Sequence, residues 1–262
     1  GVPVLTANYL TGLLPFIKKS KVVVHQQDPM PGLANRFAIK FADIKSCLFE
    51  YTKQKYKNFQ NSILIPNPID QKKYLKSESE HKSILVDTYP DLEKFLDSKE
   101  PPILLVFGGG SGSLDINNWL LNNLFGLLSK FKIIHIKGAL QEELQYPKHE
   151  NLYQFQSVNK AMPSLLAVSD FILCRAGLGS ISELRILNKK AFLVPLPHSH
   201  QELNAELIKD EFIILKQSEM DNWLNIIEDN IDNYSHKINL FADTNSKALN
   251  NYKDSILNCL ND

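Results

Sequence analysis

The sequence predicts an α/β protein made of two Rossmann-like, doubly wound domains, of which the first is incomplete. Short β-branched runs alternate with longer segments of helical periodicity, which is typical of βαβ units around a parallel sheet. The 262 residues are 44% apolar, enough to build a core. The chain begins at Gly1 without Met, and only three predicted strands precede a long polar stretch, so we expect a truncated first domain.

Three apolar runs in the first half predict strands at 21–26, 46–50 and 62–66. The segment GLANRFAIKFAD (32–43) between the first two has apolar residues at roughly helical spacing. After residue 70 the chain becomes polar, and Pro90 and the pair Pro101-Pro102 indicate a connection that carries one or two short helices. The predicted division is a partial first domain at 1–78, a linker at 79–100 and a second domain at 101–262.

The second half predicts a nearly complete α/β series. Its first strand is expected in PPILLVFGGG, and four more are expected at 132–137, 170–175, 191–197 and 212–216. Helices are expected between them, at 113–130, 162–168, 180–187 and 201–210. Two amphipathic helices are expected from about Asp221 onward.

Composition excludes several classes of function. Basic and acidic residues balance at 29 each, so no net positive field favours nucleic acid. Cys47, Cys174 and Cys259 match no zinc or CxxC spacing, and we interpret them as buried thiols. His198 and His200 lack a third ligand nearby, so no metal site is expected. No apolar run is long enough for a membrane span.

A glycine-rich turn follows the first strand of the second domain, in LLVFGGGSGSLDINNWL (104–120). Glycines there allow a close backbone approach to an anion at the start of the next helix. The P-loop pattern fails because Ser113-Leu114 follows Gly112, and the dinucleotide fingerprint fails because position 115 is Asp. A structural turn without a ligand is an equally good interpretation.

The segment CRAGLGSISELRIL (174–187) repeats the strand–turn–helix arrangement. Arg175 at the strand end requires an anionic or carbonyl partner. Ser180 and Glu183 have the spacing of a capping box, which favours a purely structural role as helix initiators. Alternatively, Glu183 binds the vicinal hydroxyls of a ribose, as acidic residues do in dinucleotide folds.

A third strand end lies in LVPLPHSHQELNAELI (193–208), where the amides of Gln201 and Asn204 suit hydroxyl-rich ligands such as sugars. All three loops are expected at the carboxyl ends of parallel strands, the edge where open α/β sheets bind ligands. Together they indicate a nucleotide with a diphosphate and a sugar. In the first half, His25, Gln26, Gln27 and Asp28 end a strand and either face that ligand or, in the case of Asp28, cap a helix.

Four segments resemble, in the same order, motifs of the MurG family, the peripheral transferases that add N-acetylglucosamine (GlcNAc) to make lipid II: VVVHQQDPMPGLANRFAIKFAD, VFGGGSGSLDIN, CRAGLGSISELRIL and LVPLPHSHQELNA. The resemblance implies an inverting, metal-independent transferase of the two-Rossmann-domain GT-B fold, without a cofactor. Its donor is UDP-GlcNAc and its acceptor an undecaprenyl-linked muramyl-pentapeptide. It further implies a bacterial enzyme of peptidoglycan synthesis, cell shape and division, bound to the cytoplasmic membrane face, to which the segment LLPFIKKSK (13–21) could contribute.

The resemblance also implies residue roles. The glycine turn lies by the diphosphate, the turn after Arg175 lies against the nucleotide, Glu183 binds ribose and Gln201 reaches the sugar. The donor-binding candidates are Gly108, Gly109, Gly110, Ser111, Gly112, Arg175, Gly177, Leu178, Gly179, Ser180, Ile181, Ser182, Glu183, Gln201 and Asn204. A wall of the cleft on the first domain is expected from His25, Gln26, Gln27 and Asp28; no catalytic base is assigned.

Three positions depart from the family pattern. Asp28, Asp70 and Gly110 replace the family's Asn, Arg and Ser. The family's glycine-rich amino-terminal loop would precede Gly1, so we expect weak donor binding and little or no transfer by these 262 residues alone. Two alternatives stay open: a GT-B transferase with a different acceptor, and an inactive nucleotide-sugar-binding subunit.

Overall fold

The computed structural model describes residues 21–67, 69–98, 100–139, 145–231, 233–234 and 241–261. The chain divides into two compact units. Unit 1 comprises Gly1–Pro68 and Leu240–Asp262, and unit 2 comprises Ile69–Asn239.

Unit 1 contains a parallel sheet in the order β1 (Val23–Gln26), β2 (Ile44–Cys47) and β3 (Ile63–Leu64). Its helical elements are α2 (Leu33–Ala38), η1 (Ile39–Phe41), α3 (Glu50–Lys55), η2 (Lys57–Phe59) and α12 (Phe241–Asn261). The small core holds Val24, Ala38, Ile39 and Phe59. All three strands predicted for the first half are present, with the second beginning two residues earlier than expected.

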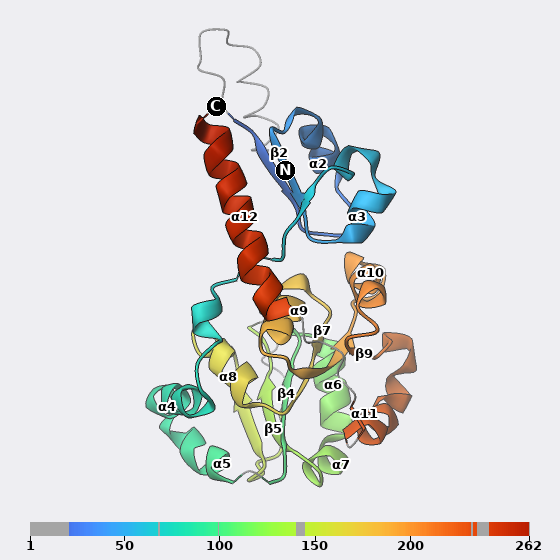
Figure 1. The fold of residues 1–262 in the computed structure, drawn as a ribbon. Helices are drawn as coiled ribbons and strands as arrows, with labels where there is room; N and C mark the ends of the chain where they lie inside the picture. The colour runs from blue at the N-terminus through green and yellow to red at the C-terminus, as the bar shows by residue number, and fades with distance from the viewer. Residues whose placement is uncertain are drawn as a thin grey trace. The chain divides into compact units, whose positions relative to one another are not determined.

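Unit 2 is built on a six-stranded parallel sheet (Figure 1). Its strands are β4 (Ile103–Phe107), β5 (Lys132–Ile136), β6 (Leu152–Phe155), β7 (Phe171–Arg175), β8 (Lys190–Val194) and β9 (Ile213–Ile214). The spatial order β6-β5-β4-β7-β8-β9 corresponds to 3-2-1-4-5-6 along the chain, which is the doubly wound Rossmann order. The predicted fold class is therefore confirmed for this unit.

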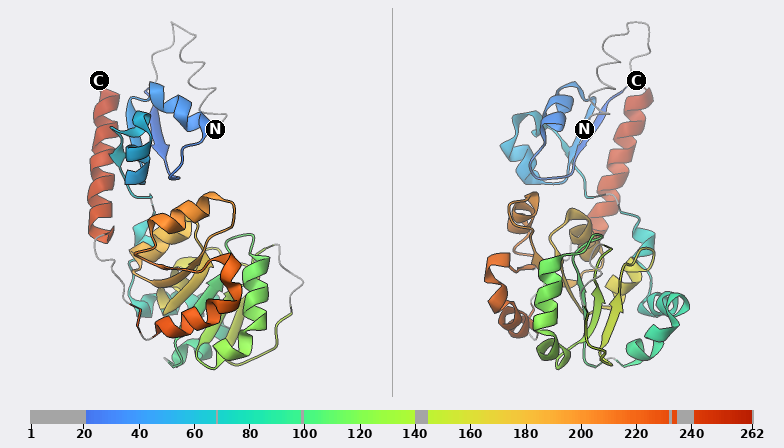
Figure 2. Two further views of the ribbon diagram at one scale, coloured as in Figure 1. Left: turned by 90° about the vertical axis from the view of Figure 1, so that its right-hand side faces the viewer. Right: turned by 180° about the vertical axis from the view of Figure 1, so that it is seen from behind.

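Helices cover both faces of this sheet. The helical elements of unit 2 are η3 (Gln71–Lys73), α4 (Glu78–Thr88), η4 (Pro90–Leu92), α5 (Glu93–Asp97), α6 (Leu114–Asn122), α7 (Leu124–Leu128), α8 (Met162–Val168), α9 (Leu178–Ile186), α10 (His200–Leu207), η5 (Gln217–Asn222) and α11 (Trp223–Ile231). Helices α4, α5 and α8 lie on one side of the sheet, and α6, α7 and α11 lie on the other (Figures 1 and 2). Strands β4, β5 and β7 are consequently buried along their whole length, which explains why most of their residues are apolar.

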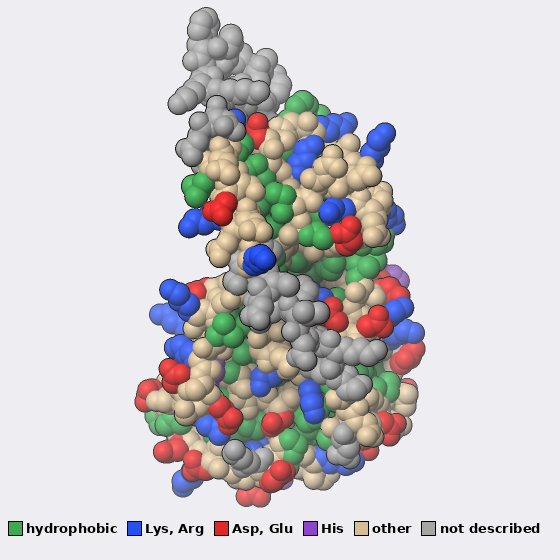
Figure 3. Space-filling view, viewed as in Figure 1, with side chains coloured by type: hydrophobic (Ala, Val, Ile, Leu, Met, Phe, Trp, Pro, Cys, Tyr) green, Lys and Arg blue, Asp and Glu red, His purple; other side chains and the backbone are tan. Residues whose placement is uncertain are grey.

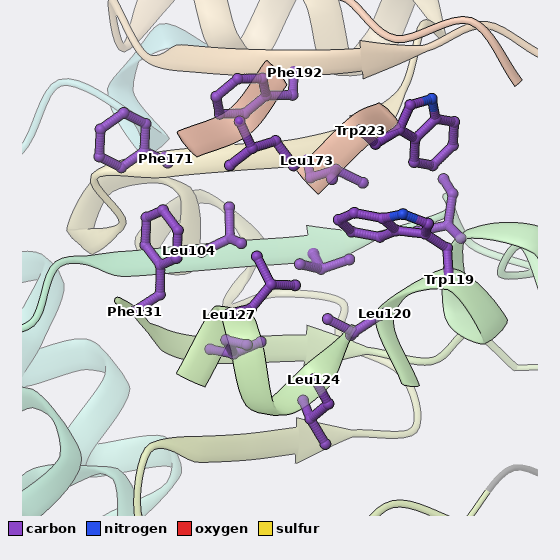
Figure 4. Packing of buried hydrophobic residues seen from close by; sticks show 14 of the residues in the cluster. Leu104, Trp119, Leu120, Leu124, Leu127, Phe131, Phe171, Leu173, Phe192 and Trp223 are labelled. Atoms are coloured by element: carbon purple, nitrogen blue, oxygen red, sulfur yellow. The ribbon is translucent and has the colours of Figure 1, made fainter. Parts of the chain in front are cut away.

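Aromatic residues fill the core on the α6 side (Figure 4). Trp119 and Trp223 lie 5.3 Å apart between ring centroids and are 4% and 0% exposed. Each indole nitrogen donates to a main-chain oxygen, that of Met220 for Trp119 and that of Lys216 for Trp223. These bonds satisfy the polar ends of both rings, and the bond from Trp119 joins α6 to η5, the turn before α11.

Three features differ from the predicted division into domains. Residues 69–78, predicted to end the first domain, belong to unit 2. Residues 79–100, predicted to be a linker, belong to unit 2 and bury Leu85, Leu92 and Leu96. The C-terminal helix α12, predicted to end the second domain, belongs to unit 1. Its Tyr252 hydroxyl lies 3.1 Å from the hydroxyl of Ser46 in β2. In residues 79–100, the apolar side chains are spaced so that short helices can bury them, and their burial explains why this segment belongs to unit 2.

Some boundaries in unit 2 also differ. Strand β6 was not predicted; its residues are only partly buried, so the apolar signal is weak. The single helix expected at 113–130 is two helices, α6 and α7, separated at Asn123. Helix α9 begins at Leu178, two residues before the predicted start.

Charges of both signs are interspersed over the face of unit 2 seen in Figure 3, in keeping with the balanced composition. In the part of the chain that the structure describes, no helix has the length and apolarity needed to cross a membrane. The segment 13–21, considered above for membrane contact, lies outside the described residues except for Lys21.

Candidate functional site

Arg175, the last residue of β7, joins the carboxyl ends of three strands. Its Nη2 donates to Ser113 Oγ at 2.7 Å, in the loop after β4. Its Nη1 donates to the Pro195 carbonyl at 3.5 Å, in the loop after β8, and to Gln217 Oε1 at 2.8 Å. Asp115 Oδ2 lies 3.3 Å from Nη2 and balances the charge.

This arrangement satisfies the requirement for a partner that the sequence suggested for Arg175. Its side chain is 10% exposed, and burial lowers the pKa of the guanidinium while Asp115 raises it. Because both terminal nitrogens are engaged inside the protein, Arg175 organises the strand ends. Direct donor contact by Arg175 stays a prediction.

The glycine-rich turn divides into closely packed and open positions. A Cβ on Gly108 would lie 2.4 Å from the Ser113 backbone nitrogen, so this glycine is required by packing. Gly109 has a φ of +95° and Gly112 a φ of +86°, both in the left-handed region that favours glycine. In contrast, nothing lies within 4 Å of a Cβ placed on Gly109 or Gly110. The 109–110 backbone therefore has room for a ligand.

Gly138, at the end of β5, supports that turn and was not singled out from the sequence. Its φ is +98°, and a Cβ there would lie 2.1 Å from Gly112 Cα. The amide of the following residue, Ala139, donates to the Gly110 carbonyl at 3.1 Å. The turn is thus packed backbone to backbone against the neighbouring strand end.

Helix α9 begins without a side-chain cap. Its N-cap is Gly177, and its first intrahelical bond runs from Ile181 N to the Gly177 carbonyl at 2.9 Å. The amides of Leu178, Gly179 and Ser180 precede that bond. The helices after the neighbouring strands differ, because Ser113 caps α6 and Ser199 caps α10.

The capping-box interpretation of Ser180 and Glu183 is wrong. Ser180 is the third helical residue rather than the N-cap, so Glu183 lies well inside α9. Instead, Glu183 Oε1 accepts a hydrogen bond of 2.8 Å from the Tyr74 hydroxyl. Burial raises the pKa of Glu183, and the bond from Tyr74 lowers it.

The two amides of the third loop have different environments. Asn204 is fully buried, and its Nδ2 donates to the Ala176 carbonyl at 3.3 Å, within the turn before α9. Gln201 is half-buried and its Oε1 accepts from Leu196 N at 3.1 Å. Its Nε2 has no hydrogen-bond partner among the described residues. Asn204 is therefore placed to shape the turn and Gln201 to contact a ligand.

The remaining candidate residues, most of them in α9, differ in how exposed they are. Leu178 and Ile181 are 8% and 1% exposed, so only their backbone can contact a ligand. The Ser182 hydroxyl donates to the Leu178 carbonyl within the helix. Gly179 is exposed and has nothing within 4 Å of a Cβ. Ser111 is also exposed.

The four candidates on the first domain lie in unit 1. Gln26 is 3% exposed, and its side chain donates to the Asp28 carbonyl at 2.7 Å and accepts from Asn35 Nδ2 at 2.7 Å. His25 Nδ1 lies 3.1 Å from Ser46 Oγ, and burial lowers the pKa of His25. Gln27 is exposed and donates to Asn67.

The alternative role of Asp28 as a helix cap is wrong, because α2 begins at Leu33 with Gly32 as its N-cap.

Among the described residues no group of three or more His, Cys, Asp or Glu side chains could hold a metal ion. The site in unit 2 consists of amides, hydroxyls, the carboxylate of Glu183 and an arginine paired with Asp115.

The comparison with known families agrees with this arrangement. The sequence model of the "Glycosyltransferase family 28 C-terminal domain" matches residues 103–258, which is more than half of the chain and contains all six strands of unit 2. The chain belongs to glycosyltransferase family 28. The predicted resemblance to MurG-type members of this family is confirmed by curated relatives.

Two of these relatives carry the name UDP-N-acetylglucosamine–N-acetylmuramyl-(pentapeptide) pyrophosphoryl-undecaprenol N-acetylglucosamine transferase. The Clostridium tetani protein is 30% identical over 260 residues, covering 97% of this chain and 65% of the relative. The Geobacillus kaustophilus protein is 36% identical over 197 residues, covering 74% of this chain and 50% of the relative. The family 28 chain thus spans about half to two-thirds of their length.

A solved structure supports the fold. The crystal structure of Acinetobacter baumannii MurG superposes with a TM-score of 0.60 at 23% identity, covering 88% of this chain and 61% of that one. The fold class predicted from the sequence, two Rossmann-like units of GT-B type, agrees with this match.

Proposed function

We propose that this chain is the donor-binding part of a glycosyltransferase that moves GlcNAc from UDP-GlcNAc to a lipid-linked muramyl-pentapeptide. The names of the curated relatives support the reaction. The observation that carries the site is the junction at Arg175, which connects the loops after β4, β7 and β8. This junction lies where the strand order reverses, between β4 and β7, and open α/β sheets bind nucleotides at that point.

The donor diphosphate binds between the glycine turn and the start of α9. The uncapped amides of Leu178, Gly179 and Ser180 donate to phosphate oxygens, and the helix dipole favours their negative charge. The open backbone at Gly109 and Gly110 allows the second phosphate to approach. Neither feature requires a cation in the site.

The sugar groups of the donor bind on either side of this diphosphate. The free oxygen of Glu183 accepts from the ribose hydroxyls, and the unpaired Nε2 of Gln201 donates to the GlcNAc hydroxyls. Asn204 acts behind them, by holding the Ala176 carbonyl in the turn.

In the transfer step, an acceptor hydroxyl attacks the anomeric carbon with inversion and loses its proton. The bond from that carbon to the β-phosphate oxygen breaks, and UDP departs with an additional negative charge. Amides aimed at the departing diphosphate stabilise this charge without rearrangement. The α9 terminus supplies them.

The partners follow from the same proposal. Unit 2 is the donor domain, and unit 1 is part of the acceptor domain. The acceptor is an undecaprenyl-linked saccharide, so the whole protein works at the cytoplasmic face of the membrane as a peripheral enzyme. No cofactor takes part.

Calorimetric titration with UDP tests the donor site. The chain is expected to bind UDP, and Glu183→Ala is expected to weaken binding at least tenfold with little change in folding stability. Glu206→Ala, on the exposed surface of α10, is the matched control. Absence of UDP binding, or equal binding by both variants, would contradict the site. Transfer by the full-length protein to lipid-linked muramyl-pentapeptide tests the reaction, and transfer only to another acceptor would contradict it.

A further inference from the structure

Tyr74 contacts the proposed ribose-binding carboxylate from a segment far away in the sequence. It directly follows η3, 109 residues before Glu183, and precedes the region 103–258 that matches the family model. Tyr74 is 7% exposed, and its hydroxyl donates to Glu183 Oε1 at 2.8 Å. The other carboxylate oxygen, Oε2, has no hydrogen-bond partner in the part of the chain that the structure describes.

Two buried groups hold the backbone of Tyr74. His81 Nε2 lies 3.0 Å from the Tyr74 carbonyl, and His81 Nδ1 lies 3.0 Å from Ser164 Oγ. A carbonyl only accepts, so Nε2 carries the hydrogen and donates to the Tyr74 carbonyl oxygen. His81 and Ser164 are 1% and 3% exposed. Helices α4 and α8 therefore fix the position from which the phenol reaches Glu183.

The bond from Tyr74 opposes the effect of burial on the carboxylate. Burial raises the pKa of Glu183, whereas the donated hydrogen bond stabilises its ionised form and lowers the pKa. Burial and the neighbouring Glu183 and Asp70 raise the pKa of Tyr74, so the phenol stays a donor. Burial, and to a smaller extent the charge of Glu183, raises the pKa of the Cys174 thiol, so this group stays neutral.

We propose that Tyr74 is a positioning residue for the nucleotide: it holds Oε1 of Glu183 so that Oε2 is presented to the ribose hydroxyls. This inference rests on the proposed donor site. A carboxylate fixed at one oxygen loses less rotational freedom when the ribose binds. The hydrogen bond from Tyr74 also favours the ionised carboxylate, which is the acceptor that both ribose hydroxyls require.

The test compares UDP with its 2′,3′-dideoxy analogue, which lacks both hydroxyls, by calorimetry at pH 7.5. For the unaltered chain, UDP is expected to bind at least tenfold more tightly than the analogue. Tyr74→Phe keeps the buried ring, and it is expected to reduce UDP affinity about fivefold while leaving analogue affinity unchanged. Tyr89→Phe, a half-buried tyrosine just after α4, is the matched control and is expected to change neither.

Glu183→Gln separates the two proposals. If Glu183→Gln leaves the preference for UDP unchanged, the donor site itself is wrong. If Glu183→Gln abolishes the preference and a folded Tyr74→Phe keeps it, the role of Tyr74 is overturned while the donor site stands.

A measurement on the unaltered chain covers the case in which Tyr74→Phe does not fold. Both ligands carry the same phosphates, so the titration of the phosphates cancels in the ratio of the two affinities. The pH dependence of this ratio therefore reports the protonation of Glu183. With Tyr74 supporting the ionised carboxylate, the ratio is expected to hold from pH 8 to pH 6 and to fall below that. A ratio already lost at pH 7 would overturn the inference.

Discussion

Arg175 Nη2 donates to the hydroxyl of Ser113 at 2.7 Å, which ties the end of β7 to the start of α6. Ser113 is also the N-cap of α6, where its oxygen accepts from Ile116 N at 3.4 Å. One hydroxyl therefore both starts a helix and anchors the neighbouring strand end. The geometry of the proposed donor site depends on this shared contact.

Arg175→Lys tests the junction. Lysine keeps the charge but lacks the planar fork that reaches Ser113, Gln217 and Pro195 together. We expect a loss of about 1–3 kcal/mol in the free energy of unfolding, because buried hydrogen-bonding groups lose their partners. UDP affinity is expected to fall as well. Urea unfolding and calorimetry measure the two effects.

The matched control is Lys209→Met, which removes an exposed ion pair with Glu206. Such pairs contribute little, so neither stability nor UDP binding should change measurably. If Arg175→Lys behaved like this control, the junction would have no structural role.

Gly138 and Gly110 are expected to respond oppositely to alanine. Gly138→Ala places a methyl group against Gly112 at a φ of +98°, so it should destabilise unit 2 by more than about 1 kcal/mol. Gly110→Ala meets open space and should leave stability nearly unchanged, yet weaken UDP binding by crowding the phosphate. Thermal unfolding with and without UDP distinguishes them. Equal effects on both properties would contradict the division of the turn into packed and open glycines.

Glu183→Gln is expected to stabilise the unliganded protein at pH 8. Burial raises the pKa of Glu183 in the folded state, so the folded chain takes up a proton more readily than the unfolded chain. The contribution of Glu183 to stability therefore falls as pH rises through this raised pKa, and glutamine removes that loss. An increase of a few degrees in Tm at pH 8, shrinking toward pH 5, is expected from melting curves, since about 1 kcal/mol shifts Tm by about 2–4 °C. A lower Tm for the variant at pH 8 would show that Glu183 stabilises the fold.

Tryptophan fluorescence should report on unit 2 alone. The chain has two tryptophans, and both lie in the core between α6, α11 and the sheet. Trp223→Ala is expected to cost about 3–5 kcal/mol, because it leaves a cavity beside Trp119 and removes the bond to the Lys216 carbonyl. Fluorescence and circular dichroism during urea unfolding measure this loss. A change below 1 kcal/mol would contradict the packing described for this core.

The sequence predicted the strands best where both faces are buried. The strands β4, β5 and β7 are buried along their whole length, are mostly apolar and lie where expected, whereas the partly exposed β6 has too weak an apolar pattern to be predicted. In the segment of α2 and η1 the apolar residues have roughly helical spacing, but Ala38 and Ile39 are buried while Leu33 and Phe37 are exposed. Local spacing does not reveal which side of a short helix meets the core.

The site was predicted as a set of loops, but not in its internal contacts. The expectation that three loops lie at one edge of the sheet follows from parallel topology alone. Tyr74 was missed because it lies in a charged segment, and Gly138 because an isolated glycine has many uses. Ser180 and Glu183 matched a capping box, but the helix starts at Leu178, directly after Gly177, which is the N-cap and has extended backbone geometry. These contacts depend on tertiary packing, which spacing does not encode.

The central claim is that the loops after β4, β7 and β8 bind one uridine diphosphate together. Amide hydrogen exchange followed by mass spectrometry, with and without saturating UDP, tests it most directly. We predict slower exchange in all three segments 108–114, 176–183 and 196–204, and no change in α4 or α11. Slower exchange in one of these segments alone, or in none, would contradict the claim.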